Sequence, residues 1–214
     1  MKKTAITLMM CLVTVVIFAQ DLVPFIGANG KYGYKRKNGQ EVISPKYFIV
    51  GNFKEGLAMV MLDYKCGFVD MQGTEVITIK YDTAYDFSGG LAIVKLDGKQ
   101  GFIDKTGKEV IPLKYDEATE FSDGLAWVIL NGKRGFIDKA GNEVIPIKYD
   151  VAFDYFSDGL VGVKLNGKWG FVDKTGKDVI PHKYDEVSSF SKGRSKVKLG
   201  GRTFYINKKG NKVK

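Results

Sequence analysis

The sequence predicts an all-β fold: six tandem three-stranded antiparallel units of about 34 residues, stacked as a propeller-like or open spiral array. Tight-turn signals recur at the same interval, and apolar alternation typical of strands lies between them. The interval itself is set by a glycine that precedes an aromatic residue at Gly33, Gly67, Gly101, Gly135 and Gly170, with Phe204 at the sixth position. A fixed period of this length is the mark of a repeat architecture.

The repeating unit is clearest at residues 91–115, where strands are predicted at 91–96, 99–104 and 108–115. Asp97-Gly98 between the first two strands favours a type I′ hairpin, which needs positive φ at both positions. Asp104 to Gly107 fits a type I turn. Each unit is therefore predicted to form a three-stranded meander, which is stable only when one of its faces is covered.

Two features modify this pattern. Asp63-Tyr64 replaces the usual pair in the second hairpin, which predicts a strained or longer turn there. Proline occurs late in the third strand, at Pro112, Pro146 and Pro181. Because proline donates no ladder hydrogen bond, this strand is predicted to lie at an edge or to be kinked.

Taken in order, residues 20–214 are predicted to form one β-repeat domain whose units lie near 22–47, 57–81, 91–115, 125–149, 160–184 and 194–214. The link between Tyr149 and Gly159 holds one residue more than its equivalents. The first and last units are the most polar or irregular, which favours an open array with capped ends.

Alternation in the first strand of each unit divides its residues between two faces. Ala92, Val94, Leu96 and their equivalents are expected to face the buried stack. The alternate positions vary in size and charge, and we expect them to face solvent or a ligand; they include Met59, Met61, Ile93, Trp127, Gly162 and Lys196.

Residues 1–19 have the pattern of a signal peptide. Lys2 and Lys3 precede an apolar run that is shorter than a membrane span, and Ala19 is suited to cleavage before Gln20. We expect export to the periplasm, the cell surface or the medium, with no membrane span after cleavage. An uncleaved N-terminal anchor is the alternative.

Charge and cysteine content narrow the function classes. The chain carries a formal charge of +9, and +7 without Lys2 and Lys3. A basic net charge can favour binding to anionic surfaces, or it can simply keep the protein soluble. Because we expect the protein to be exported, we expect no nucleic-acid partner. Only Cys66 follows the leader, so no intramolecular disulfide is expected. We expect a monomer.

Residues 167–176, Gly-Lys-Trp-Gly-Phe-Val-Asp-Lys-Thr-Gly, followed by Val179-Ile180-Pro181, resemble the WG or KWG repeat family of bacterial proteins. The resemblance covers nearly all of the chain after the leader, although only Trp169-Gly170 has the full Trp-Gly pair. It implies an all-β repeat fold and a bacterial source. It assigns no catalytic residue.

No catalytic, metal or cofactor site is predicted. His182 is the single histidine, whereas structural zinc commonly needs four ligands. The aspartates that recur once per unit, such as Asp104, are explained by turn capping. A second aspartate recurs directly after the tyrosine that ends each of units two to five, as Asp116 follows Tyr115. We call these the exit aspartates, and capping of the link explains them.

Variable positions within the repeat are the candidate binding residues. Trp127, Arg134 and Trp169 are the candidates, because exposed aromatic residues and arginine are enriched at binding hot spots. Filling of gaps between units by the two tryptophans is the alternative explanation.

The leading hypothesis is an exported, non-enzymatic binding or interaction module with an unknown protein or glycan partner. One alternative is a carbohydrate-active enzyme on a propeller-like scaffold, which needs two carboxylates in different environments. The other is electrostatic attachment to anionic envelope polymers, which would weaken as salt screens the charges.

Overall fold

A computed structural model of the 214-residue chain describes residues 22–213. The predicted leader, residues 1–19, lies outside the described residues. Over the described range, the regular structure consists of strands β1 to β23, arranged in six antiparallel sheets. No helix able to span a membrane is found in this range.

The first sheet holds three strands and each later sheet four, of which the first has two residues. The first sheet contains β1 (Leu22–Ile26), β2 (Tyr32–Arg36) and β3 (Glu41–Tyr47). The second contains β4 (Ile49–Val50), β5 (Ala58–Leu62), β6 (Lys65–Val69) and β7 (Glu75–Tyr81). The third contains β8 (Thr83–Ala84), β9 (Leu91–Leu96), β10 (Lys99–Asp104) and β11 (Glu109–Tyr115).

The remaining sheets repeat this order. The fourth contains β12 (Glu117–Ala118), β13 (Ala126–Leu130), β14 (Lys133–Ile137) and β15 (Glu143–Tyr149). The fifth contains β16 (Val151–Ala152), β17 (Leu160–Leu165), β18 (Lys168–Asp173) and β19 (Asp178–Tyr184). The sixth contains β20 (Glu186–Val187), β21 (Arg194–Leu199), β22 (Arg202–Asn207) and β23 (Lys212–Val213).

The three predicted strands of each unit are confirmed, and the structure adds a fourth in sheets two to six. The added strand comes from the start of the predicted link, as β8 does when Thr83 and Ala84 pair with Lys95 and Val94. A run of two residues carries no alternation that could identify it as a strand. The link is therefore part of the sheet, which places its later residues beside the first long strand.

The tight turns have the predicted geometry. Asp97 and Gly98 have φ of +50° and +79°, as a type I′ turn requires. The strained hairpin is also confirmed, since Asp63 and Tyr64 have φ of +48° and +61° without a glycine. The third strands lie at sheet edges, with Pro112 exposed on β11.

The recurring glycine is required by a bulge in the third strand. The pairing of β10 with β11 shifts register on either side of Phe102. The extra backbone of β11 crosses close to Gly101, where an added Cβ would meet the carbonyl oxygen of Ile111 at 2.6 Å. Only glycine allows this approach.

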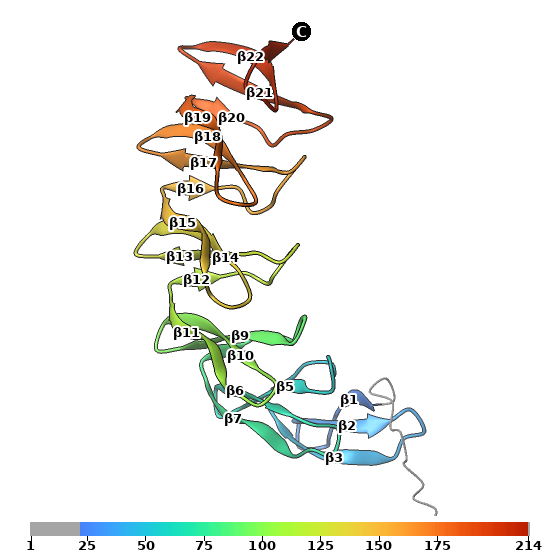
Figure 1. Ribbon diagram of the computed structural model, residues 1–214. Coiled ribbons are helices and arrows are strands. Elements are labelled where there is room, and N and C mark those ends of the chain that lie inside the picture. The colour runs from blue at the N-terminus through green and yellow to red at the C-terminus, as the bar shows by residue number, and fades with distance from the viewer. Residues whose placement is uncertain (1–21, 214) are drawn as a thin grey trace, which may run out of the picture.

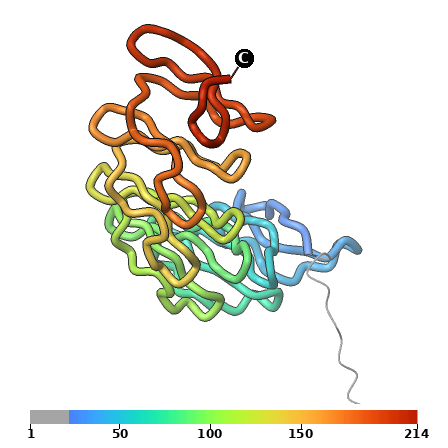
Figure 2. The backbone as a smooth tube through the Cα atoms, turned by 45° about the horizontal axis from the view of Figure 1, so that its top comes forward, coloured from blue at the N-terminus to red at the C-terminus, as the bar shows by residue number. Residues whose placement is uncertain are grey.

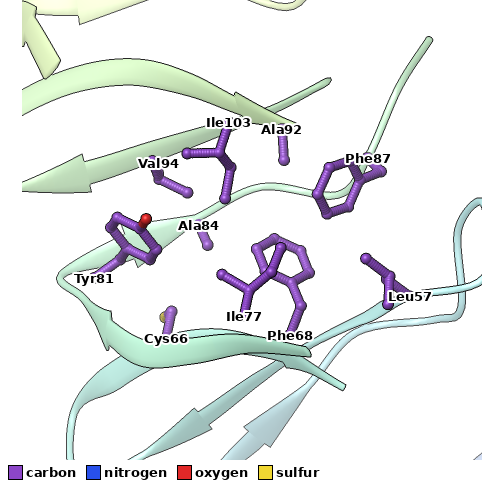
Figure 3. Packing of buried hydrophobic residues seen from close by; sticks show 10 residues of the cluster. All are labelled: Leu57, Cys66, Phe68, Ile77, Tyr81, Ala84, Phe87, Ala92, Val94 and Ile103. Carbon is purple, nitrogen blue, oxygen red and sulfur yellow. The ribbon is translucent and has the colours of Figure 1, made fainter. Parts of the chain in front are cut away.

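Five hydrophobic clusters lie at the junctions between successive sheets. Figure 3 shows one of them, in which side chains from the second and third sheets point toward one another. The predicted buried face is confirmed, since Ala92 and Val94 are buried. The prediction for the alternate face is wrong at Ile93, which packs against the fourth sheet, and at Gly162, which is buried beside the ring of Phe153.

The link also supplies a buried or half-buried phenylalanine ring to each junction. The ring of Phe87 lies 4.9 Å from that of Phe68, and Phe121 lies 4.9 Å from Phe102. Aromatic pairs at such separations stabilise beyond the area that they bury. Each link is thereby held on the sheet that precedes it.

The sheets form an open, curved stack. Figure 1 shows the path from β1–β3 at one end to β21 and β22 at the other, and Figure 2 separates the same ends in a second view. Among the described residues, β1–β3 pair only with one another, and β20–β23 do the same. The open spiral is thus the arrangement that the chain adopts.

The exit aspartates connect successive hairpins along one edge of the stack. Asp116 lies 2.5 Å from Lys99 Nζ and also accepts the N–H of Gly132 in the next hairpin. The hydrogen bond from Lys99 is the main reason that the pKa of this carboxyl is below its usual value. The same arrangement recurs at Asp82, Asp150 and Asp185.

This pairing predicts a pH dependence of stability. Because the pKa of Asp116 is lower in the folded chain than its unfolded value of about 3.9, its contribution is fully present above that value. The contribution is lost as the pH falls through the folded pKa. Urea unfolding measured at a series of pH values gives the free energy of unfolding of the wild type and of Asp116→Asn. The difference between these two free energies should shrink below about pH 4. A difference that persists at pH 2 would contradict the pairing.

Candidate functional site

Two of the three sequence-predicted binding residues lie together. Trp127 on β13 and Arg134 on β14 are diagonal neighbours on one face of the fourth sheet, since Trp127 pairs with Phe136 and Ile129 with Arg134. The guanidinium carbon of Arg134 lies 4.5 Å from the centre of the Trp127 ring. A cation at this distance is attracted to the face of the indole.

Arg134 is held in place by three contacts. Besides the stacking on Trp127, its Nη1 donates to the carbonyl of Ala152 at 3.0 Å and to Asp154 Oδ1 at 3.1 Å. The Arg134 side chain is 25% exposed and that of Asp154 is 66% exposed. The guanidinium is thus oriented before any partner arrives, while part of it still faces solvent.

Trp169 is at the same repeat position as Arg134, but one sheet further on. Its ring lies 5.0 Å from that of Phe153, and Lys164 Nζ lies 6.0 Å from it. It packs against the junction between the fifth and sixth sheets. The structure therefore assigns Trp169 largely to packing and does not join it to the Trp127–Arg134 pair.

Cross-strand neighbours explain why the two sheets differ. On the fourth sheet the large Trp127 lies beside the small Thr119, whose hydroxyl accepts the N–H of Trp127. On the fifth, the large Phe153 lies beside Gly162, where an added Cβ would meet the Phe153 ring at 2.6 Å. Each such pair has room for one bulky side chain. In the fourth sheet the first long strand carries it, and in the fifth sheet the link carries it.

The one-residue insertion lies at this same place. When the links are aligned, the extra residue of the 150–159 link falls at Tyr155, whose side chain is 62% exposed. Asp154 and Tyr155 were not identified from the sequence as site residues. The longer interval between Gly135 and Gly170 was the signal that could have located them.

Trp127, Asp154 and Tyr155 line a small hollow between the fourth and fifth sheets, together with Thr119, Glu120, Ser122, Asp123, Leu125, Phe136 and Phe156. Its volume is about 60 Å³. Pockets that enclose small molecules are several times larger, roughly 300 Å³ and above. This hollow therefore suits one protruding group of a larger partner.

A larger hollow of about 400 Å³ has Glu55, Asp86 and Glu120 in its lining. Lys105 Nζ lies 3.0 Å from Glu55 Oε2, and the N–H of Gly90 also donates to this carboxylate. The hydrogen bond from Lys105 is the main cause that lowers the pKa of Glu55. A glycosidase acid needs the opposite shift.

The remaining polar candidates have structural roles in the described range. Asp104 Oδ1 accepts the N–H groups of Thr106 and Lys108 within its own turn, as predicted. His182 is half-buried, and its ring lies 5.8 Å from that of Tyr149. Cys66 is buried, and burial raises the pKa of its thiol. No cluster of three or more metal-ligating side chains is found among residues 22–213.

Comparison with known proteins assigns the family. The model of the WG containing repeat matches residues 32–66, 67–99, 101–133, 135–169 and 169–202. The chain belongs to the WG containing repeat family. These matches span more than half of the chain, and they confirm the resemblance seen in residues 167–176. No curated protein matches this WG-repeat chain in sequence.

Solved structures show weak likeness to the WG-repeat chain. Kluyveromyces lactis Hsv2 with loop 6CD replaced by a Gly-Ser linker is 11% identical, with a TM-score of 0.46 over 89% of this chain and 75% of that one. A eukaryotic initiation factor has the same identity and score over 89% and 62%. The AfRom2 CNH domain, also 11% identical, scores 0.37 over 89% and 82%. At these scores the matches carry no inference about function.

Proposed function

We propose that this WG-repeat chain is an exported, non-enzymatic binding module that holds a protein or glycan partner at the junction of its fourth and fifth sheets. The observation that carries the proposal is the pre-oriented Arg134, stacked on Trp127 and paired with Asp154 where the repeat gains a residue. Arginine and tryptophan together are typical of interaction hot spots.

The junction geometry favours binding over catalysis. The hollow beside Trp127 admits a side chain or a sugar substituent and is too small to enclose a substrate. The carboxylate-lined hollow supports hydrolysis poorly, because Glu55 is held ionised by Lys105. Export rests on the leader pattern of residues 1–19.

The test is a pull-down with the immobilised chain against envelope and culture fractions of its host, at low and at moderate salt. We expect a partner that survives moderate salt and whose affinity falls at least 10-fold in Arg134→Gln, since hot-spot arginines contribute on the order of 2 kcal/mol. Arg202→Gln, which removes an exposed arginine from β22, is the matched control and should bind as the wild type does.

Two outcomes would favour the alternatives. Capture that disappears between low and moderate salt would indicate attachment to anionic polymers through net charge. Hydrolysis of a glycan that is lost in Glu120→Gln would indicate an enzyme. Equal capture by the wild type and Arg134→Gln would remove the fourth–fifth junction from the proposal.

A further inference from the structure

The junction between the first and second sheets departs from the other four. At the later junctions each exit aspartate pairs with the lysine seventeen residues before it, as in Lys65 with Asp82 and Lys99 with Asp116. At the first junction the lysine is Lys31, and Phe48 stands where the aspartate would be. The substitution removes a carboxylate from the edge of the stack.

Lys31 is consequently left without an anionic partner in the described part of the chain. No carboxylate within residues 22–213 lies at ion-pair distance from its ammonium group. A second lysine, Lys46, lies beside it, with its ammonium group 5.1 Å from the centre of the Tyr47 ring. This edge therefore attracts negative charge.

The hairpin that faces Phe48 departs from the repeat as well. Tyr64 has φ of +61° at a position that is glycine in every other hairpin, as at Gly98 with φ of +79°. A side chain there is strained, because the left-handed conformation brings Cβ close to the following carbonyl. Such strain is a reason to look for a function at this turn.

The two departures meet in space. The rings of Phe48 and Tyr64 lie 6.0 Å apart at an angle of 49°, and these residues are 61% and 80% exposed. With Lys31, Lys46, Leu62 and Asp63 they line a hollow of about 180 Å³. The chain thus exchanges an ion pair and a glycine turn for two exposed aromatic rings beside an unpaired lysine.

We propose that Phe48, Tyr64 and Lys31 form a docking site for an acidic segment of a partner protein. An apolar side chain of that segment contacts the two rings, as at the aromatic centre of protein interfaces. A neighbouring carboxylate pairs with Lys31 and takes the place of the aspartate that the other junctions have. This surface is separate from the one formed by Trp127 and Arg134.

The test uses a fluorescein-labelled peptide of alternating glutamate and leucine with the full chain, read by fluorescence anisotropy. We expect saturable binding, and at least 10-fold weaker binding of the alternating lysine–leucine and glutamate–serine peptides. Lys31→Gln should weaken binding several-fold and reduce its salt dependence, because it removes one charge pair.

The decisive variant is Phe48→Asp with Tyr64→Gly, which restores the pattern of the other junctions. It should melt at or above the wild-type temperature and lose at least 10-fold in affinity for the glutamate–leucine peptide. Tyr205→Ser, which removes an exposed tyrosine from the sixth sheet, should change neither property. Unchanged affinity of the double variant would overturn the proposal. So would failure of the wild type to bind, or binding to phosphatidylglycerol vesicles in place of the peptide.

Discussion

Replacement of Phe102 by alanine is expected to lower the free energy of unfolding by roughly 3–5 kcal/mol. Phe102 is 1% exposed and belongs to the core between the third and fourth sheets, and its ring lies 4.9 Å from that of Phe121. Truncation loses the transfer free energy of the ring and leaves a cavity, since the neighbouring sheets cannot collapse without shifting the stack. Urea unfolding followed by circular dichroism measures the change.

Tyr85→Ala is the matched control for this loss. Tyr85 is also aromatic and directly follows β8 of the third sheet, but it is 46% exposed. Surface truncations of this kind usually change stability by less than about 0.5 kcal/mol, and partial burial raises that to roughly 1 kcal/mol. Equal losses for Phe102→Ala and Tyr85→Ala would mean that the junction cores do not carry the stability.

Gly101→Val is expected to destabilise the chain by about 3 kcal/mol or more. The added Cβ would lie 2.6 Å from the carbonyl oxygen of Ile111 and 2.7 Å from the backbone of Pro112. Both neighbours are backbone atoms, so relief requires that the bulge in β11 move away from β10. The melting temperature should fall, and Gly135→Val should behave alike because an added Cβ there would also meet backbone, at 2.6 Å from the carbonyl oxygen of Ile145.

Gly132→Val separates steric contact from backbone strain. Gly132 has φ of +72°, yet an added Cβ would find no atom within 4 Å. Its cost is therefore conformational alone, on the order of 1–3 kcal/mol. A Gly132→Val loss that exceeds the Gly101→Val loss would show that turn conformation, and not the bulge contact, is the tighter constraint on this repeat.

The fold was largely predictable because its determinants are local. The Asp97-Gly98 pair and Pro112 act on φ, on hydrogen-bond donors and on the side chains next to them, so their effects are readable without coordinates. The two-residue strands such as β8 were not predicted, since they form only when the link meets a neighbouring strand. Burial of Ile93 was missed because it depends on the next sheet.

The candidate site was predictable only in part. Trp127 and Arg134 were identified as departures from the repeat, and pairing of β13 with β14 brings them together. Trp169 departs in the same way but is largely used for packing against Phe153. Asp154 joins the site through a link whose path no local pattern describes.

By itself the sequence determined the period, the hairpin turns, the position of each long strand and the residues that break the pattern, because each of these depends on neighbours along the chain. The tertiary structure alone decided that the stack stays open and that both faces of a middle sheet are covered. It also decided that Phe48 and Tyr64 meet beside an unpaired Lys31. These features depend on contacts between residues that are not neighbours along the chain, so no local pattern in the sequence specifies them.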